Sequence, residues 1–243
     1  MVLRYTSFVL FLALDTCDSR GSIALLDDGR ILNEISHPAG DEYSSWLLPA
    51  IDRLLSESGL THSNLEGYAV ASGPGSFTGV RVGLTTAKAW AEVYSKPIFP
   101  VSRLAILADY AQKDAEFAAT FIDAQRRQIF AALYRRESEQ WELVGEECVI
   151  DPVEFFKYAA QTAGKEPISW VSLDPDLLTT NSSWRFPKDN EAAVIRVKPP
   201  LASSVGKYAI AHFRERGTDA LMLDANYIRR SDAEIFGKKA AGT

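Results

Sequence analysis

The stretch with the strongest chemical signature is a glycine-rich block, Gly73-Pro74-Gly75-Ser76-Phe77-Thr78-Gly79-Val80-Arg81-Val82-Gly83, which follows a short apolar run. Such a turn before a helix can bind phosphate, because backbone N–H groups converge at a helix N-terminus. However, no Lys-Ser or Lys-Thr follows the glycines as in a Walker loop, and Gly73, Gly75 and Gly79 miss the dinucleotide fingerprint by one residue. Two interpretations stay open, an anion-binding loop and a tight turn whose glycines permit close packing, and the spacing favours the second.

Two aspartates end apolar runs, in Asp15-Thr16-Cys17 and Asp123-Ala124-Gln125. A phosphate-binding hairpin needs glycine just after such an aspartate, so that the backbone can approach the phosphates closely. Neither segment has one, so both hairpins are predicted to be degenerate. Asp15 is then expected to accept hydrogen bonds from nearby backbone amides of its own turn.

The histidines are His37, His62 and His212, and no two of them lie within twenty residues of each other. Histidines that share a metal on one helix stand four residues apart, because that spacing puts both on one face. Each histidine is therefore predicted to be an isolated surface or loop residue. Two cysteines, Cys17 and Cys148, form neither a disulfide framework nor a Cys-x-x-Cys pair, so we expect no metal and a reducing cytoplasm.

Composition predicts an ordinary globular protein, because 47% of the 243 residues are hydrophobic and 24% are charged. The net charge of −6 excludes a global positive field, so we expect the chain alone not to bind nucleic acid strongly. The apolar run Phe8 to Leu14 resembles part of a leader peptide, but it is much shorter than a membrane span. A buried first strand is the preferred interpretation, and no membrane association is expected.

The elements that would position these residues begin with a three-stranded meander over Phe8 to Leu14, Ser22 to Leu26 and Arg30 to Ser36, turning at Asp27-Asp28-Gly29. An amphipathic helix follows over Asp41 to Ser58, and Pro49 requires either that its regular hydrogen-bond ladder begins near Trp46 or that the helix carries a kink. A strand is expected next over Tyr68 to Ala71, followed by a helix over Val80 to Tyr94 that Ser76 or Thr78 caps. A short strand over Ile98 to Phe99 and a helix over Ser102 to Ala111 come after it.

The pattern then restarts. Strands are expected over Ala118 to Asp123, Ile129 to Tyr134, Trp141 to Val149, Ile168 to Leu173 and Val194 to Val197, with a helix over Asp151 to Ala163, a loop after Leu173, and a last helix over Ser203 to Arg216 that stops at Gly217. Meander, helix, strand and helix in two copies predict the two-lobed α/β, actin-like fold of the acetate and sugar kinases, Hsp70 and actin. The expected lobes are residues 1–104 and 105–225, with the final helix able to cross back to the first lobe, followed by a tail at 226–243.

Five segments in order resemble the TsaB (YeaZ) family: Leu12-Ala13-Leu14-Asp15-Thr16, Leu47-Leu48-Pro49-Ala50-Ile51, the Gly73 to Gly83 block, Asp123-Ala124-Gln125-Arg126-Arg127, and Tyr227-Ile228-Arg229-Arg230-Ser231-Asp232-Ala233-Glu234. The resemblance implies a cytoplasmic, non-catalytic subunit required for the N6-threonylcarbamoyladenosine modification of adenosine 37 in tRNA. It implies a heterodimer with the catalytic subunit TsaD, a larger complex with TsaE, only indirect contact with tRNA, and no cofactor. A stand-alone actin-fold small-molecule kinase is the alternative, and the histidine spacing argues against a third candidate, a metalloprotease.

The helix after the glycine block carries Arg81, Thr85 and Lys88 on one stripe, and Val82, Thr86, Ala89 and Val93 on another. We expect this helix and the preceding one to pack against TsaD, and a plain core helix is the competing interpretation. The predicted interface residues are Tyr43, Trp46, Leu47, Ala50, Ile51, Leu54, Thr78, Arg81, Val82, Thr85, Thr86, Lys88 and Ala89. Exposed apolar helices also make self-association of the isolated chain plausible.

Two features remain open at this level. Tyr43 stands where the family commonly has histidine, so this chain lacks that histidine at the expected interface. Arg126 and Arg127 either reach RNA or nucleotide or make surface ion pairs, and the surface interpretation is preferred. The basic residues Arg229, Arg230, Lys238 and Lys239 are interpreted as a solvated tail.

Overall fold

The computed structural model describes residues 9–179 and 194–212. The described residues divide into two compact units, one formed by residues 9–102 with 199–212 and the other by residues 103–179 with 194–198. Each unit contains one five-stranded sheet and the helices that cover it.

The sheet of the first unit has the strand order β3-β2-β1-β4-β5. Its strands are β1 (Leu10–Asp15), β2 (Ser22–Asp27), β3 (Arg30–Ser36), β4 (Gly67–Gly73) and β5 (Ile98–Ser102). The first three form the predicted antiparallel meander, whereas β4 runs parallel to β1 and β5 parallel to β4. The side chains of β1 from Phe11 onward are buried on both faces of the sheet, which explains its unbroken apolar run.

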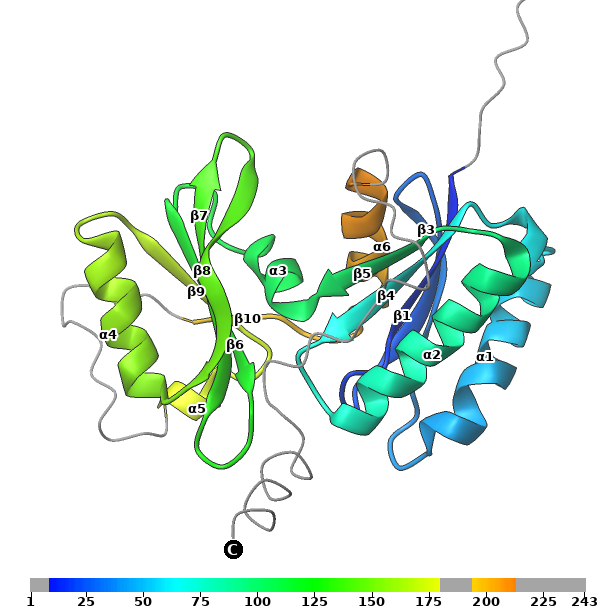
Figure 1. Cartoon of the computed structure of the whole chain (residues 1–243), viewed down its shortest axis with the longest axis horizontal. Coiled ribbons are helices and arrows are strands. Elements are labelled where there is room, and N and C mark those ends of the chain that lie inside the picture. Colours follow the sequence, from blue (N-terminus) through cyan, green and yellow to red (C-terminus); the bar gives the residue numbers. More distant parts are fainter. Residues whose placement is uncertain (1–8, 180–193, 213–243) are drawn as a thin grey trace, which may run out of the picture. The chain divides into compact units, whose positions relative to one another are not determined.

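Helices cover both faces of this sheet (Figure 1): α1 (Tyr43–Glu57) and α2 (Phe77–Tyr94) pack on one face, and α6 (Ala202–Ala211) on the other. A short 3-10 helix, η1, spans His62–Asn64. Helix α1 begins at Tyr43 and continues through Pro49. Its hydrogen-bond ladder starts with the Trp46 N–H, which donates to the Glu42 carbonyl oxygen (3.1 Å), as the first of the two predicted options has it. Helix α2 begins three residues before the predicted start, because the Ser76 hydroxyl accepts a hydrogen bond from the Gly79 N–H (3.4 Å) and caps it.

Helix α6 is capped by residues that are distant in sequence. Its N-cap residue, Leu201, supplies no side-chain cap. Instead the N–H of Ala202 donates to the Ser22 hydroxyl (3.0 Å), and the N–H of Ser203 donates to the Glu34 carboxylate (2.9 Å). The strands β2 and β3 therefore satisfy the first backbone donors of the helix. The helix ends at Ala211, and the rest of its predicted extent, residues 213–216, lies outside the described part of the chain.

The second unit repeats the arrangement with the strand order β10-β9-β6-β7-β8. Its strands are β6 (Phe117–Asp123), β7 (Ile129–Glu137), β8 (Gln140–Ile150), β9 (Ile168–Ser172) and β10 (Ile195–Arg196). Helix α4 (Pro152–Ala163) covers one face and α3 (Arg103–Ala108) the other (Figure 1). The core under α4 is built from aromatic and aliphatic side chains that include Phe117, Phe121, Phe155 and Trp170.

Most local predictions for this unit are confirmed, and two were wrong in detail. Asp151 caps α4 by accepting from the N–H groups of Val153 (2.8 Å) and Glu154 (3.4 Å). Helix α3 is shorter than the predicted Ser102 to Ala111, and a short helix α5 (Asp176–Thr179) occupies part of the predicted loop.

In both sheets the two strand pairings on one side of the central strand are antiparallel and the two on the other side are parallel. Three meander strands followed by crossover connections, in two copies, are the two-lobed actin-like fold, as the duplicated pattern predicts. Within residues 9–179 and 194–212, no helix combines the length and the apolar character needed to cross a membrane.

Candidate functional site

The glycine block lies directly against the loop that follows β1. A Cβ atom on Gly75 would lie 2.3 Å from the carbonyl oxygen of Cys17, and one on Gly79 would lie 2.1 Å from the carbonyl oxygen of Thr16. One on Gly83 would lie 2.4 Å from the Thr16 hydroxyl oxygen. Real Cβ atoms do not approach other atoms this closely, so these glycines are required for the backbone of α2 and of the turn before it to pack on residues 16 and 17.

Hydrogen bonds close the same contact. The Ser76 N–H donates to the Cys17 carbonyl oxygen (2.6 Å), and the buried Thr16 hydroxyl donates to the Gly79 carbonyl oxygen (2.6 Å). The Gly79 N–H donates to the Ser76 hydroxyl. Two backbone N–H groups that an anion would need are thus bonded within the chain, which favours the packing interpretation of the block over a phosphate loop.

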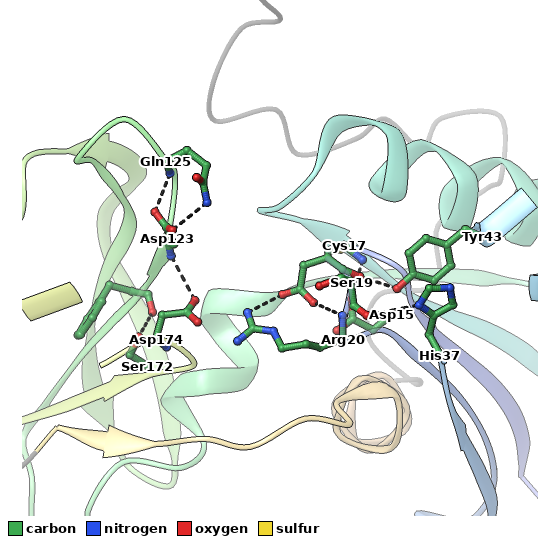
Figure 2. Close-up of polar contacts among 12 residues, drawn as sticks. Asp15, Cys17, Ser19, Arg20, His37, Tyr43, Asp123, Gln125, Ser172 and Asp174 are labelled. Atoms are coloured by element: carbon green, nitrogen blue, oxygen red, sulfur yellow. Dashed lines mark hydrogen bonds and ion pairs between the residues drawn. The ribbon is translucent and has the colours of Figure 1, made fainter. Parts of the chain in front are cut away.

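The aspartates at the ends of β1 and β6 each hold their own turn (Figure 2). Asp15 is buried and accepts a hydrogen bond from the Cys17 N–H (3.0 Å), as predicted. Asp123 accepts from the Gln125 backbone N–H (2.7 Å) and from the Gln125 side-chain amide (2.8 Å). The two units therefore use the same carboxylate position to shape a turn.

His37 is the residue whose placement differs most from its prediction. It was expected to be an isolated surface or loop residue, yet it is buried. Its ring stacks on Tyr43 with centroids 4.1 Å apart and meets Trp46 edge-on at 4.9 Å, and its Nδ1 lies 3.3 Å from the Ser19 carbonyl oxygen. The end of β3 thus supplies a histidine next to the first turn of α1.

The Tyr43 side chain is hydrogen-bonded to the loop after β1. Its hydroxyl donates a hydrogen bond to the Asp18 carbonyl oxygen, and a Cβ on Gly21 would overlap that hydroxyl. Burial raises the pKa of Tyr43, and the nearby Asp15 and Asp18 carboxylates add to this effect. The phenol therefore stays protonated and acts as a hydrogen-bond donor.

His62 belongs to a second aromatic cluster in the first unit. Its Nδ1 lies 3.1 Å from the Tyr68 hydroxyl, and its ring packs on Trp90 (4.4 Å) and Tyr94 (5.1 Å). Burial lowers the pKa of His62, so the neutral ring is favoured. Among the residues that the structure describes, no group of three or more His, Cys, Asp or Glu side chains is arranged to hold a metal ion.

The predicted interface residues fall into two sets. Leu47, Ala50, Ile51 and Leu54 of α1 are buried within the first unit. Their surface is used inside the chain, so these four side chains support α1 and do not offer area to a partner. The pattern of apolar residues identified the packed face of α1, not a face awaiting a second protein.

The remaining predicted residues lie on the outer side of α1 and α2, where Thr78, Arg81, Thr85 and Ala89 are exposed and Tyr43, Trp46, Val82, Thr86 and Lys88 are partly exposed. The Arg81 guanidinium stacks on the Phe77 ring at 3.6 Å. Exposed apolar side chains on these helices that the predicted set omits include Leu48 (51% exposed) and Val93 (73%). Both are apolar residues out of phase with the buried stripe, which is the sequence signal for an apolar outer face.

Known proteins match this chain over most of its length. The family model described as TsaD, tRNA N6-adenosine threonylcarbamoyltransferase, matches residues 35–214 of the 243. The tRNA threonylcarbamoyladenosine biosynthesis protein TsaB of Escherichia coli (strain K12) is 31% identical over 67% of this chain and 69% of its own length. The chain belongs to the TsaB family. TsaB of Bacillus subtilis (strain 168) is 35% identical, and that match spans 51% of this chain and about half, 54%, of the relative.

A solved structure of YeaZ from Pseudomonas aeruginosa has a TM-score of 0.66 and 28% identity, covering 88% of this TsaB-family chain and 96% of that one. A second structure from the same organism, described as similar to peptidase YeaZ, reaches a TM-score of 0.71 at 28% identity, with 90% and 99% covered. The Tyr227 to Glu234 segment and the basic residues of the tail lie outside the described residues.

Proposed function

We propose that this chain is a non-catalytic subunit of tRNA threonylcarbamoyladenosine biosynthesis that binds and activates the transferase TsaD. The names of its TsaB relatives support the pathway, and the match to the transferase family supports a partner with a related fold. In this proposal the protein works in the cytoplasm, joins TsaE in a larger complex, meets tRNA only as part of that complex, and pairs with itself when TsaD is absent.

The observation that carries the proposal is the outer face of α1 and α2. Leu48 and Val93 expose apolar side chains there, and the short side chains of Thr85 and Ala89 lie on the exposed side of α2. Exposed apolar side chains on adjacent helices are typical of interaction surfaces. Short side chains one and two turns before Val93 on the same helix allow a second helix to approach closely.

The closed loop after β1 supports a role without nucleotide chemistry. In a kinase of this fold, the backbone after the first strand must leave room for phosphates. Here the backbone at Gly75 and Gly79 packs directly on that loop, and the Ser76 N–H is bonded to Cys17. This packing favours the accessory-subunit proposal over the stand-alone kinase.

Reconstitution tests the function directly. Modification of tRNA is measured with a purified TsaC-type enzyme, TsaD and TsaE, with and without this chain. We expect modified tRNA to form only when the chain is present and expect no turnover from the chain alone. Equal modification in its absence, or catalysis by the isolated chain, contradicts the proposal.

Interface variants test the surface. We expect Ala89→Glu and Val93→Glu to weaken co-purification with TsaD, because each places an unpaired carboxylate inside the contact. A penalty of about 2–5 kcal/mol corresponds to roughly a 30-fold or greater rise in Kd. Leu143→Glu on β8 is the matched control, because Leu143 is also an exposed apolar residue (42%) but belongs to the second unit. Self-association of the isolated chain should respond to the same two variants.

A further inference from the structure

The turn that joins β6 to β7 has an unfavourable backbone conformation. Gln125, Arg126 and Arg127 have φ values of 62°, 57° and 62°, so three successive residues that are not glycine lie in the left-handed region. Residues other than glycine usually visit this region singly, because Cβ crowds the following carbonyl oxygen. A run of three therefore persists only where the surrounding contacts impose it.

Specific hydrogen bonds hold this turn. Both oxygens of the Asp123 carboxylate accept from Gln125, one from its backbone N–H and one from its side-chain amide. Across the turn, the Ala124 N–H donates to the Gln128 carbonyl oxygen (3.0 Å), and the Gln128 N–H donates to the Gln125 carbonyl oxygen (3.0 Å). The turn is thereby closed on itself around its exposed tip.

The two residues displayed at this tip are arginines. Arg126 and Arg127 are both exposed, so burial of their side chains does not offset the unfavourable backbone. Arg127 makes no ion pair or hydrogen bond with another described residue. A constrained, exposed turn that contributes little to the core is characteristic of a ligand-binding segment.

We propose that Arg126 and Arg127 form a phosphate-binding tip that contacts the backbone of the tRNA substrate within the assembled modification complex, in place of the surface role and the indirect tRNA contact expected from the sequence; this inference rests on the proposed function. A guanidinium stays charged at all physiological pH values and can donate two parallel hydrogen bonds to one phosphate. Two adjacent guanidinium groups on a rigid turn suit a polymer that carries phosphates in series. Because the chain has a net charge of −6, this contact is local and does not arise from a global positive field.

Asparagine is the informative replacement, because it removes the charge and tolerates the left-handed conformation. The variants are Arg126→Asn, Arg127→Asn and the double change. Arg30→Asn is the matched control, because Arg30 also follows a hairpin turn and its side chain is 76% exposed. The Kd of fluorescently labelled tRNA is measured for the complete assembly over a range of KCl concentrations.

We expect the double variant to bind tRNA about tenfold more weakly near physiological salt, and expect the slope of log K against log[salt] to fall by about 1 for each arginine. Arg30→Asn should change neither quantity. An unchanged Kd and slope would overturn the inference, as would weakened association with TsaD in the absence of tRNA, which would assign the arginines to a protein carboxylate. The proposed function would fail by a different result, which is tRNA modification of equal extent in the reconstitution assay when this chain is left out.

Discussion

The close approach of Gly83 to Thr16 makes a prediction that a pair of substitutions can test. Gly83→Ala introduces a Cβ 2.4 Å from the Thr16 hydroxyl oxygen, whereas the next nearest atoms, the Thr16 Cβ and Val70 Cγ2, are 3.6 Å away. Only the hydroxyl oxygen is therefore too close. Thr16→Ala removes that oxygen, so each substitution should change the effect of the other.

The expected magnitudes follow from these contacts. Overpacking at Gly83 should cost about 3 kcal/mol of unfolding free energy, offset by about 1 kcal/mol because alanine favours the helix, which leaves a loss of about 2 kcal/mol. Thr16→Ala should cost about 2 kcal/mol, because it removes the hydrogen bond to Gly79 and one buried methyl group. In the double variant the overpacking disappears, so we expect a loss of about 1 kcal/mol instead of the additive value of about 4 kcal/mol.

Urea denaturation of the four purified proteins gives the coupling free energy, expected to be about 3 kcal/mol and well above the usual deviation from additivity of about 0.5 kcal/mol. Thr16→Ser serves as one control, because it keeps the hydroxyl oxygen and should not rescue Gly83→Ala. Gly79→Ala serves as the other, because its Cβ would meet a backbone carbonyl oxygen that Thr16→Ala does not remove. Additive free energies in the Gly83 and Thr16 double variant would refute the steric reasoning.

Three further predictions concern pH and stability. Burial lowers the pKa of His62, so the unfolded chain binds the imidazole proton more tightly than the folded chain does. The free energy of unfolding should therefore fall as pH drops below about 6.5. Urea denaturation at several pH values should show a smaller fall for His62→Phe, which lacks the imidazole. Ser22→Ala and Glu34→Ala should each cost about 1 kcal/mol in the same assay, because each removes a cap of α6, and Glu34→Gln should retain most of the stability. Tyr43→Phe should cost about 1 kcal/mol, because it removes the hydrogen bond to Asp18. Since burial raises the pKa of Tyr43, the stabilisation by its hydroxyl should be lost as pH rises above about 10. Above that pH, the free energy of unfolding should therefore fall less for Tyr43→Phe than for the unaltered chain.

The strands and the duplication could be predicted from sequence because they depend on local patterns. The run up to Asp15, the Asp-Gly hairpin before β3 and the Asp151 cap of α4 are each determined by a few neighbouring residues. The position of α2 could be predicted to within three residues for the same reason, since Gly73, Gly75 and the capping Ser76 precede it directly.

The surface against which an apolar helix face packs could not be predicted in this way. The spacing of Leu47, Ile51 and Leu54 shows that one side of α1 avoids water, but it is the same whether that side packs on the chain's own sheet or on a second protein. In the structure it packs within the first unit. Contacts between distant residues were missed for a related reason, because no local pattern links His37 to Trp46 or Glu34 to the start of α6.

The glycine block connects the closed loop with the proposed partner surface. The atoms that fill the loop after β1 are the ones that position the first turn of α2, so the outer side of that helix depends on the same packing. Gly79→Ala forces this turn away from Thr16, although Gly79 is itself buried and no exposed residue changes. We therefore expect the folded variant to bind TsaD more weakly than the unaltered chain, with a Kd raised at least several-fold in a pull-down titration, while Leu143→Glu retains full affinity. If folded Gly79→Ala bound TsaD with unchanged affinity, the position of α2 would not control the interface, and the surface proposed for TsaD would have to lie elsewhere on the chain.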